Sequence, residues 1–436
     1  MNKSKRRELS LDLTLEAAFL PVAAAATEQT ALAFGLEKKE ALQLTLAVEE
    51  VLNHLVEVGS SGEHVSLKLA DGLYYMEASI DFPLKELNLR AFNLTSGVSL
   101  EDESQLSEMG LLIASRMVDR LQLSLKNNVM RLGLYKEKYY PEAGGLKDIP
   151  AEDTDQPAIL TPGPEDLKLF CRGVTATQPG YYYPSFFSRP GKFVDMVKSG
   201  DYSALLAYNG KKQVLGGIAW RQEYEKTIEC FGPYLFRDSK EVAGALLDGF
   251  LEQVGRTRAP GVLSRWLAPG TAIEKHFESL GAADFYSSGA GPVQRAAHYR
   301  QLCEDTGSRV WAHTDLAGFL KEEYRRLFLP REVREVKDMG EHTGAYSVFS
   351  CQFDQEEVTL IPLAAGADAG VNLARHLTLF AGEGIKNIYF ELDLGEEWHA
   401  LLTPVLVRNG FRPCYILPHA GKGDLVLFQC RAGEKK

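Results

Sequence analysis

The spacing of apolar residues near the N-terminus predicts two helices in succession. Over residues 15–34 and 38–56 these positions recur every three to four residues, which places them on one face of a helix. Apolar and polar residues then alternate over 65–69 and 74–80, with Asp71-Gly72 between the two runs. An Asp-Gly pair flanked by alternating runs is typical of a tight β-hairpin. We therefore expect two helices followed by an antiparallel hairpin.

A second group of elements completes this N-terminal part. Residues 108–120 have helical spacing, and the alternating runs 121–125 and 129–135 flank Asn127-Asn128. Helices beside a mainly antiparallel sheet bury one face of each layer against the other. The pattern predicts an α+β sandwich.

A segment rich in proline and glycine separates this part from the rest of the chain. Prolines and glycines recur from Pro141 to Pro164, with acidic residues between them and few periodic apolar positions. Segments of this composition punctuate structure and often mark domain boundaries. We expect a first domain over 1–139, a linker over 140–156, and two further domains over 157–330 and 331–436.

The second half of the chain contains one pattern twice. The first copy is predicted to have strands at 203–208, 214–222, 228–236 and 261–268, and helices at 241–254 and 272–280. The second copy is predicted to have strands at 344–351, 357–362, 387–392 and 424–429, and helices at 371–381 and 397–409. Each copy ends with a helix, a glycine and an aromatic strand. We expect Gly281 and Gly410 to cap these helices in the left-handed conformation, and the recurrence indicates an internal repeat.

Composition and charge narrow the class of protein. At 436 residues the chain is long enough for two to three domains of about 150 residues each. The formal net charge of −11 argues against binding to nucleic acid, since no basic stripe is present to neutralise phosphates. No run of about 18 apolar residues exists to cross a membrane. The six cysteines form no CxxC pair, and with no export signal they are expected to be reduced thiols of a cytoplasmic protein.

The second predicted helix carries polar residues that could serve ATP chemistry. Within Leu46–Val56, Glu50 and His54 lie four residues apart on one face, as do Glu49 and Asn53. A carboxylate that orients water, one turn before a group that binds magnesium, suits such a reaction. The alternative is an amphipathic helix that presents polar groups to water, and spacing alone leaves both interpretations open.

This stretch resembles the first ATP-binding box of GHKL-type ATPases, in the branch of anti-sigma serine kinases. Residues 11–138 follow the order of that branch, with Ser79–Pro83 as the second box and Glu108–Asp119 as the third. The resemblance implies a Bergerat-type α/β sandwich that binds ATP with magnesium. It implies that Glu50 is the catalytic base, that Asn53 or His54 contacts the metal, that Asp81 binds adenine, and that Gly110 allows the backbone to approach the phosphates. The implied partner is a sigma factor or an anti-anti-sigma protein.

The sequence also departs from that branch. His54 stands at the position of the magnesium-binding Asn, and Asn53 comes one residue early, which rotates it by about 100° around the helix. Pro83 replaces a glycine that lets the backbone approach the nucleotide. The ATP-binding domain is therefore expected to be degenerate.

The region 157–431 resembles a tandem of GNAT acetyltransferases. The likeness rests on the order of several segments, among them Gly180–Pro184, Ser199–Ser203, Gly216–Trp220 and Leu327–Glu332. In GNAT enzymes a glycine-rich loop at a helix N-terminus holds the pyrophosphate of coenzyme A. The corresponding loop of the first copy, Phe236–Ala245, has no paired glycines, whereas the second copy has Gly366 and Gly370. The resemblance implies that acetyl-CoA, if bound, contacts Gly366 and Gly370.

Taken together, the sequence predicts an α+β protein with an N-terminal Bergerat-type sandwich followed by two GNAT-like units. The leading hypothesis is an anti-sigma-type regulatory protein with a degenerate ATP-binding domain coupled to the tandem region. The alternatives are an N-acetyltransferase that uses acetyl-CoA, and a protein-interaction scaffold that binds neither ligand.

Overall fold

Contacts between residues divide the computed structural model of this chain into two compact units. The structure describes residues 6–58, 63–83, 93–94, 111, 113–126, 129–144, 146, 156–222, 226–267, 272–287, 291–337 and 345–430. The first unit takes its described residues from 1–139, 343–352 and 362–379, and the second takes the others. The first unit therefore includes two segments from the C-terminal part of the sequence.

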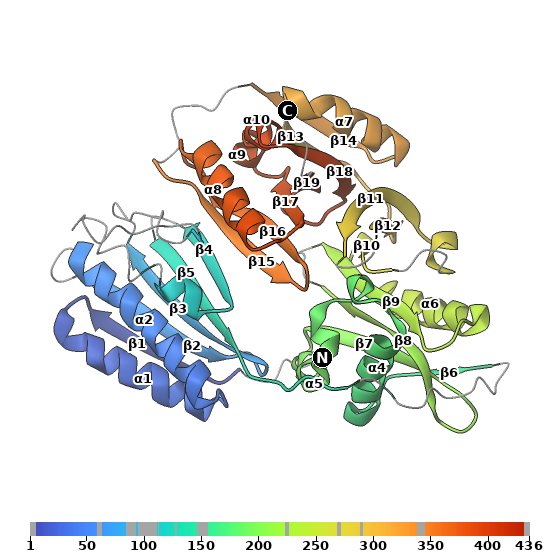
Figure 1. The fold of residues 1–436 in the computed structure, drawn as a ribbon, viewed down its shortest axis with the longest axis horizontal. Coiled ribbons are helices and arrows are strands. Elements are labelled where there is room, and N and C mark those ends of the chain that lie inside the picture. The colour runs from blue at the N-terminus through green and yellow to red at the C-terminus, as the bar shows by residue number, and fades with distance from the viewer. Residues whose placement is uncertain are drawn as a thin grey trace. The chain divides into compact units, whose positions relative to one another are not determined.

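A five-stranded antiparallel sheet forms one layer of the first unit, in the strand order β1-β2-β3-β5-β4. The strands are β1 (Glu8–Thr14), β2 (His64–Asp71), β3 (Tyr75–Pro83), β4 (Arg120–Lys126) and β5 (Val129–Glu137). Side chains alternate between the two faces of each strand, so Leu67, Ile80 and Leu132 all point to the same face. There they form one core with the helices α1 (Leu20–Ala33) and α2 (Lys38–Val58) (Figure 1). The predicted layering of helices on an antiparallel sheet is confirmed.

The sequence-based elements of this unit are close to the observed ones, with two exceptions. Strand β1 was not expected, and it pairs with β2 along its whole length, from Glu8 opposite Ala70 to Thr14 opposite His64. The helix expected over 108–120 ends earlier than expected, because residues 111 and 113–117 are helical and β4 already begins at Arg120, while 108–110 lie outside the described residues. A short 3₁₀ turn, Ala17–Phe19, precedes α1.

A seven-stranded sheet organises the second unit, in the order β11-β12-β10-β9-β8-β7-β6. The strands are β6 (Ala158–Leu160), β7 (Tyr202–Tyr208), β8 (Val214–Arg221), β9 (Thr227–Leu235), β10 (Gly261–Ser264), β11 (Glu278–Tyr286) and β12 (Pro292–Gln301). The helices are α4 (Pro164–Thr177), α5 (Pro190–Ser199) and α6 (Lys240–Val254), with 3₁₀ turns at Gly180–Tyr182, Ser185–Ser188 and Ala272–Lys275. Helix α6 buries Leu246 and Phe250 against one face. On the other face, Phe193 of α5 packs against Phe170 of α4 and against Tyr202, and Tyr202 stacks on Phe231. Tyr202 and Phe231 alternate along β7 and β9 with the residues that face α6.

The remaining strands form a five-stranded and a two-stranded sheet. The larger has the order β15-β16-β17-β19-β18, with β15 (Val348–Asp354), β16 (Glu357–Ala364), β17 (Asn387–Asp393), β18 (Phe411–Leu417) and β19 (Leu425–Cys430). Its helices are α8 (Ala369–Gly382), α9 (Glu397–Ala400) and α10 (Thr403–Arg408). The smaller sheet is the parallel pair β13 (Ser308–His313) and β14 (Arg331–Val336), joined by α7 (Thr314–Arg326).

The repeated sequence pattern corresponds to a repeated connection in the structure. Strand β9 leads through α6 to the parallel strand β10, and β16 leads through α8 to the parallel strand β17. A strand, a crossover helix and a parallel strand form the unit that creates a ligand site in many α/β proteins.

Two predicted helices of this region are wrong in different ways. The helix expected over 272–280 is only the turn Ala272–Lys275, and β11 begins at Glu278, so Gly281 does not cap a helix. Gly281 instead has φ +128° at a register shift between β11 and β12. The helix expected over 397–409 is interrupted near Pro404, which has no N–H to bond the preceding turn. The Thr403 hydroxyl donates to the Ala400 carbonyl at 2.8 Å in its place.

Gly410 does close the second of these helices, as expected. Its φ is +83°, and its N–H donates to the Val407 carbonyl at 3.1 Å. No helix among the residues described combines the length and the apolar character needed to cross a membrane.

Candidate functional site

The polar residues of α2 do not share one face of the first unit. Glu50 is half-buried, and burial, followed by the charges of Glu49 and Glu57, raises the pKa of its carboxyl. Asn53 is exposed and donates its Nδ2 hydrogen to Glu57 Oε1 at 3.4 Å. His54 is buried, with 3% of its surface exposed. The two residues expected to contact a metal therefore point in different directions from the helix.

Asp81 lies on the face of the sheet opposite to α2. The residues on either side of it, Ile80 and Phe82, belong to the core that α1 and α2 cover. Because side chains alternate along a strand, Asp81 points to the other face. There it accepts hydrogen bonds from Arg131, its cross-strand partner, with Nε 2.6 Å from Oδ1. The structure does not bring Asp81 together with Glu50, and the adjacent side chain on the helical face is the apolar Phe82.

Gly110, expected to lie near the phosphates, is outside the described residues. Among the residues that are described, no group of three or more His, Cys, Asp or Glu side chains could hold a metal ion.

The carboxyl end of the β9–β10 pair is a natural position for a ligand in the second unit. The two strands pair only from Thr227 opposite Gly261 to Cys230 opposite Ser264. Strand β9 then continues to Leu235 while β10 ends, and α6 begins shortly afterwards. Diverging parallel strands next to a helix N-terminus commonly receive an anionic ligand.

This position is filled by the side chain of Tyr234. Tyr234 is 2% exposed, and its ring packs against Phe170 and Phe187. Its hydroxyl lies 2.9 Å from the Tyr182 carbonyl oxygen and 3.1 Å from that of Trp266, the second residue after β10. The hydroxyl hydrogen is shared between these two acceptors, so Tyr234 ties β9 to the chain that leaves β10.

The start of α6 is also satisfied from within the chain. Ser239 is the N-cap residue, and its hydroxyl oxygen accepts a hydrogen bond from the Val242 N–H at 3.3 Å. Glu241 places a carboxylate in the first turn, where the helix dipole favours a negative charge. A phosphate would have to displace this cap and approach this carboxylate.

A buried ion-pair network lies on β9 close to the same end. Glu229 is 0% exposed and sits between two arginines. Arg221 donates to Oε2 from Nε at 3.1 Å and from Nη2 at 2.8 Å, and Arg265 Nε lies 3.1 Å from Oε1. Burial by itself would raise the pKa of Glu229, but Arg265 and Arg221 lower it below its ordinary value. A carboxylate held ionised by two cations is a poor proton acceptor.

Sequence reasoning did not single out Glu229. The signal was present, because an acidic residue inside the apolar run Thr227–Leu235 must be paired if it is buried. The pairing partners lie on β8 and after β10, and the sequence does not show that these segments are neighbours.

The loop before α8 is closed by another part of the chain. A Cβ added to Gly366 would lie 2.1 Å from the Ser347 backbone nitrogen. Asp368 Oδ1 accepts a hydrogen bond from that same N–H at 2.6 Å. Gly370 is in the first turn of α8. The need for glycine at 366 is thus explained by close approach of the chain at 346–347.

A buried amide network joins α8 to the segment after β3 in the first unit. Asn93, 2% exposed, donates from Nδ2 to the Ser347 carbonyl at 2.7 Å. Its Oδ1 accepts from the Phe349 N–H and from Asn372 Nδ2, both at 3.0 Å. Val348 lies in the hydrophobic core of the sandwich, and Leu363 and Ala364 pack against it. Segments of the second repeat are therefore built into the core of the first unit.

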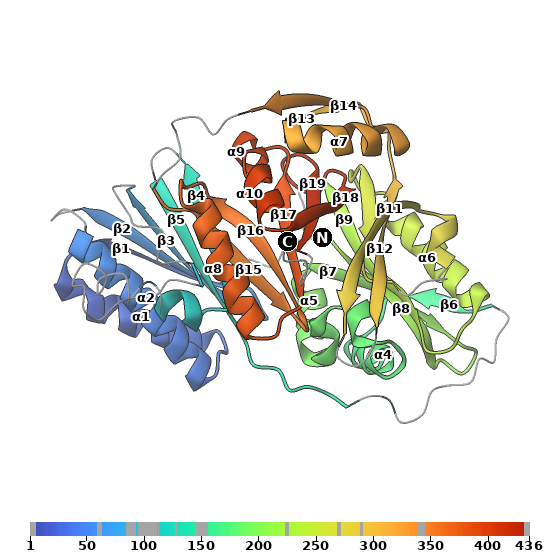
Figure 2. The same cartoon turned by 45° about the horizontal axis from the view of Figure 1, so that its top comes forward.

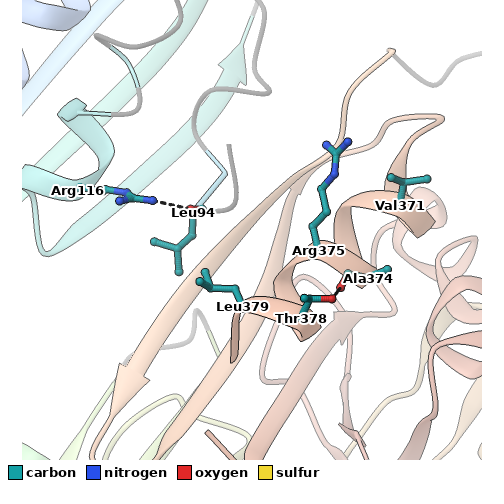
Figure 3. A pocket seen from close by; sticks show the side chains of 7 residues that line it. All are labelled: Leu94, Arg116, Val371, Ala374, Arg375, Thr378 and Leu379. Carbon is teal, nitrogen blue, oxygen red and sulfur yellow. Dashed lines mark hydrogen bonds between the residues drawn. The ribbon is translucent and has the colours of Figure 1, made fainter. Parts of the chain in front are cut away.

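Beside this network lies an open cavity of about 520 Å³ in the first unit (Figure 3). Two arginines and a threonine line it together with apolar side chains, and the described lining residues are Leu94, Arg116, Val371, Ala374, Arg375, Thr378 and Leu379. Arg116 Nη2 donates to the Leu94 carbonyl at 3.2 Å, and the Thr378 hydroxyl donates to the Ala374 carbonyl at 3.0 Å. None of the described residues that line it carries an acidic, imidazole or thiol group. The two arginines among these residues suit the binding of an anion.

Comparison with known proteins finds likeness only at the level of solved structures. No family model matches the sequence, and no curated protein matches it. A proposed acetyltransferase from Acinetobacter baylyi is 13% identical over 34% of this chain and 94% of its own, with a TM-score of 0.30. A GNAT superfamily phosphinothricin acetyltransferase from Sinorhizobium meliloti, in complex with AcCoA, is 16% identical over 35% of this chain and 91% of its own (TM-score 0.29). A GNAT family N-acetyltransferase from Escherichia coli, in complex with CoA, is 17% identical over 36% and 86% (TM-score 0.25).

Proposed function

We propose that this protein is a regulatory binding protein whose tandem acetyltransferase-like region is non-catalytic. The observation that carries the proposal is the closure of the β9–β10 end by Tyr234, with its hydroxyl held by the carbonyls of Tyr182 and Trp266. A ligand at this position would have to displace a fully buried aromatic side chain and its hydrogen bonds.

Two further arrangements support the absence of group transfer. Glu229 is neutralised by Arg221 and Arg265, so it is not available as a base. In the second repeat, Asp368 and the chain at Ser347 occupy the surroundings of the loop that would hold a pyrophosphate. In both repeats the positions that chemistry would need are therefore occupied by the protein's own groups.

The regulatory part of the proposal rests on the composition of the first unit. Because Val348 and the Asn93–Ser347–Asn372 network belong to that unit, a partner that binds the sandwich would act directly on α8. The resemblance of residues 11–138 to anti-sigma kinases suggests a sigma factor or an anti-anti-sigma protein as this partner. Bound ATP is not required, since Asp81 does not face α2.

Calorimetric titration of the full chain tests this proposal against its alternatives. Acetyl-CoA, and separately ATP with magnesium, are titrated to millimolar concentration into the purified protein, and we expect no saturable heat. Saturable acetyl-CoA binding, with acetyl transfer to an amine, would overturn the proposal in favour of an N-acetyltransferase. Saturable ATP binding that is weakened by Glu50→Gln would instead favour an ATP-dependent regulator.

A further inference from the structure

The β13–α7–β14 element ends in β14, one edge of which pairs with no other strand among the described residues. Strand β14 pairs in parallel with β13, from Ser308 opposite Arg331 to His313 opposite Val336. The other side of β13 is occupied, because the Trp311 N–H donates to the Leu394 carbonyl at 2.8 Å. Within the described part of the chain no strand pairs with the other side of β14 (Figure 2). Such an edge offers a row of backbone donors and acceptors to another strand.

The two faces of β14 differ in what their charged side chains contact. On one face Arg331 is fully buried and pairs with Asp305 and Asp424, while Glu335 pairs with Lys321 of α7. On the other face Glu332 and Arg334 are exposed to 59% and 42% of their side-chain surface. The accessible charges of this second face are thus one acid and one base, two residues apart, while on the first face Glu335 is 39% exposed and already paired with Lys321.

The order of charges in β14 permits one antiparallel register of the strand with itself. The strand reads Arg-Glu-Val-Arg-Glu-Val from Arg331 to Val336. If Val333 of one copy lies opposite Val333 of another, Glu332 faces Arg334 and Arg331 faces Glu335, in both directions. A shift by one residue either way places Glu332 opposite Glu335 or Arg331 opposite Arg334, and like charges directly opposite each other are destabilising.

We propose that β14 pairs with β14 of a second copy of this chain, antiparallel and centred on Val333. The result is a four-stranded sheet in the order β13-β14-β14-β13 about a two-fold axis, with the same surface used by both copies. Backbone hydrogen bonds supply the attraction, and the Glu332–Arg334 pairs, formed twice, select the register. The same charges oppose pairing with an unrelated hydrophobic strand.

The contact is expected to be weak and sensitive to salt. Stable interfaces bury roughly 1,200–2,000 Å², and a six-residue strand pair supplies only part of that area. Within its own chain Glu332 already pairs with Arg309 and Arg334. Dimerisation would replace such intrachain ion pairs by intermolecular ones, so the net gain is small. The pairs are solvent-exposed, so higher ionic strength screens them.

Charge reversal in the full-length protein tests both the edge and the register. Sedimentation equilibrium is measured up to high protein concentration for the wild type and for Arg334→Glu and Glu332→Arg. Arg334→Glu leaves acids at 332 and 334 of both copies, and Glu332→Arg leaves bases at both. We expect each variant alone to dimerise at least tenfold more weakly than the wild type.

Mixing the two variants is the decisive step. In a mixed dimer every acid of one copy faces a base of the other, so an equimolar mixture should regain association within about threefold of the wild type. The control Arg325→Glu reverses an exposed charge on α7, outside β14, and should leave association unchanged. The proposal is overturned if the wild type stays monomeric, if the single variants associate like the wild type, or if the mixture stays monomeric.

Discussion

Replacing Glu229 by Gln separates a structural role of this carboxylate from a catalytic one. The substitution keeps the shape of the side chain and removes its charge, which leaves Arg221 and Arg265 facing a neutral amide. Each arginine keeps other contacts: Arg221 Nη1 donates to the Tyr202 hydroxyl, and Arg265 Nη1 donates to Glu391, both at 2.9 Å.

The size of the expected effect follows from the burial of the three groups. Removing one partner of a fully buried ion pair costs about 3–5 kcal/mol. The side chains of Arg221 and Arg265 are 26% and 20% exposed, so water solvates them in part after the substitution. We therefore expect Glu229→Gln to lower the free energy of unfolding of the second unit by about 2–3 kcal/mol.

The assay has to isolate the second unit, because a chain of several units does not unfold in one step. Native-state hydrogen exchange of the amides in β9 and β10 reports the local free energy of opening. The matched control is Glu252→Gln, an exposed carboxylate that pairs with Arg256 one helical turn away, which should cost less than about 0.5 kcal/mol.

The dependence on pH gives a second readout of the same group. Arg265 and Arg221 hold the pKa of Glu229 below its ordinary value. The stability that this carboxylate contributes is therefore complete above the unfolded pKa of about 4.3 and is lost as pH falls through the folded value. Glu229→Gln should remove this acid-dependent loss. A stability cost below about 0.5 kcal/mol, or acetyl transfer by the wild type that the variant lacks, would refute the reasoning.

Three further substitutions probe the amide network, the closed β9–β10 end and a buried histidine. Asn93→Ala removes the oxygen that accepts from the Phe349 N–H and should cost about 1–3 kcal/mol, seen as faster amide exchange in both β15 and α8; unchanged exchange in α8 would contradict the coupling. Tyr234→Phe should cost about 1–2 kcal/mol in thermal unfolding and still give no acetyl-CoA binding, since the ring remains in place; saturable binding would show that the hydroxyl alone closes the site. Burial lowers the pKa of His399 to about 4, so the folded state takes up its proton later than the unfolded chain. Between pH 7 and pH 5 the wild type should lose about 2 kcal/mol more stability in urea titrations than His399→Asn, and equal losses would speak against the buried neutral imidazole.

Local patterns were sufficient for elements that depend on nearby residues. The apolar periodicity of α2 gave its start at Lys38 and its end to within two residues, and Asp71-Gly72 marked the β2–β3 hairpin. The prediction over 272–280 failed because Ile273, Phe277 and Leu280 are all buried at helical spacing. That spacing also fits a turn followed by a strand, and β12, the partner of β11, was not foreseen.

For the candidate site residues, too, the sequence predicts the element but not the face of the element. The sequence placed Asp81 near the end of a strand, but a shift of one residue in a strand moves a side chain to the opposite face. Only the pairing of Ile80 with Leu132 in the core fixes that parity and turns Asp81 toward Arg131. In the sequence Gly366 fits the pattern of a phosphate-loop glycine. In the structure, glycine is needed there because the chain at Ser347 approaches too closely for a side chain.

The sequence alone determined the α+β class, the antiparallel hairpins and the repeated connection in the C-terminal half. These features follow from the periodicity of apolar residues and from turn chemistry, which act within a few residues of the chain. The tertiary structure decided that Glu229 is paired, that Tyr234 fills the end of β9, and that Asn93 binds Ser347 and Asn372. Apart from Arg221 and Glu229, which lie eight residues apart, these groups are separated by tens to hundreds of residues. Burial makes their pairing obligatory, but the sequence does not indicate which groups will meet.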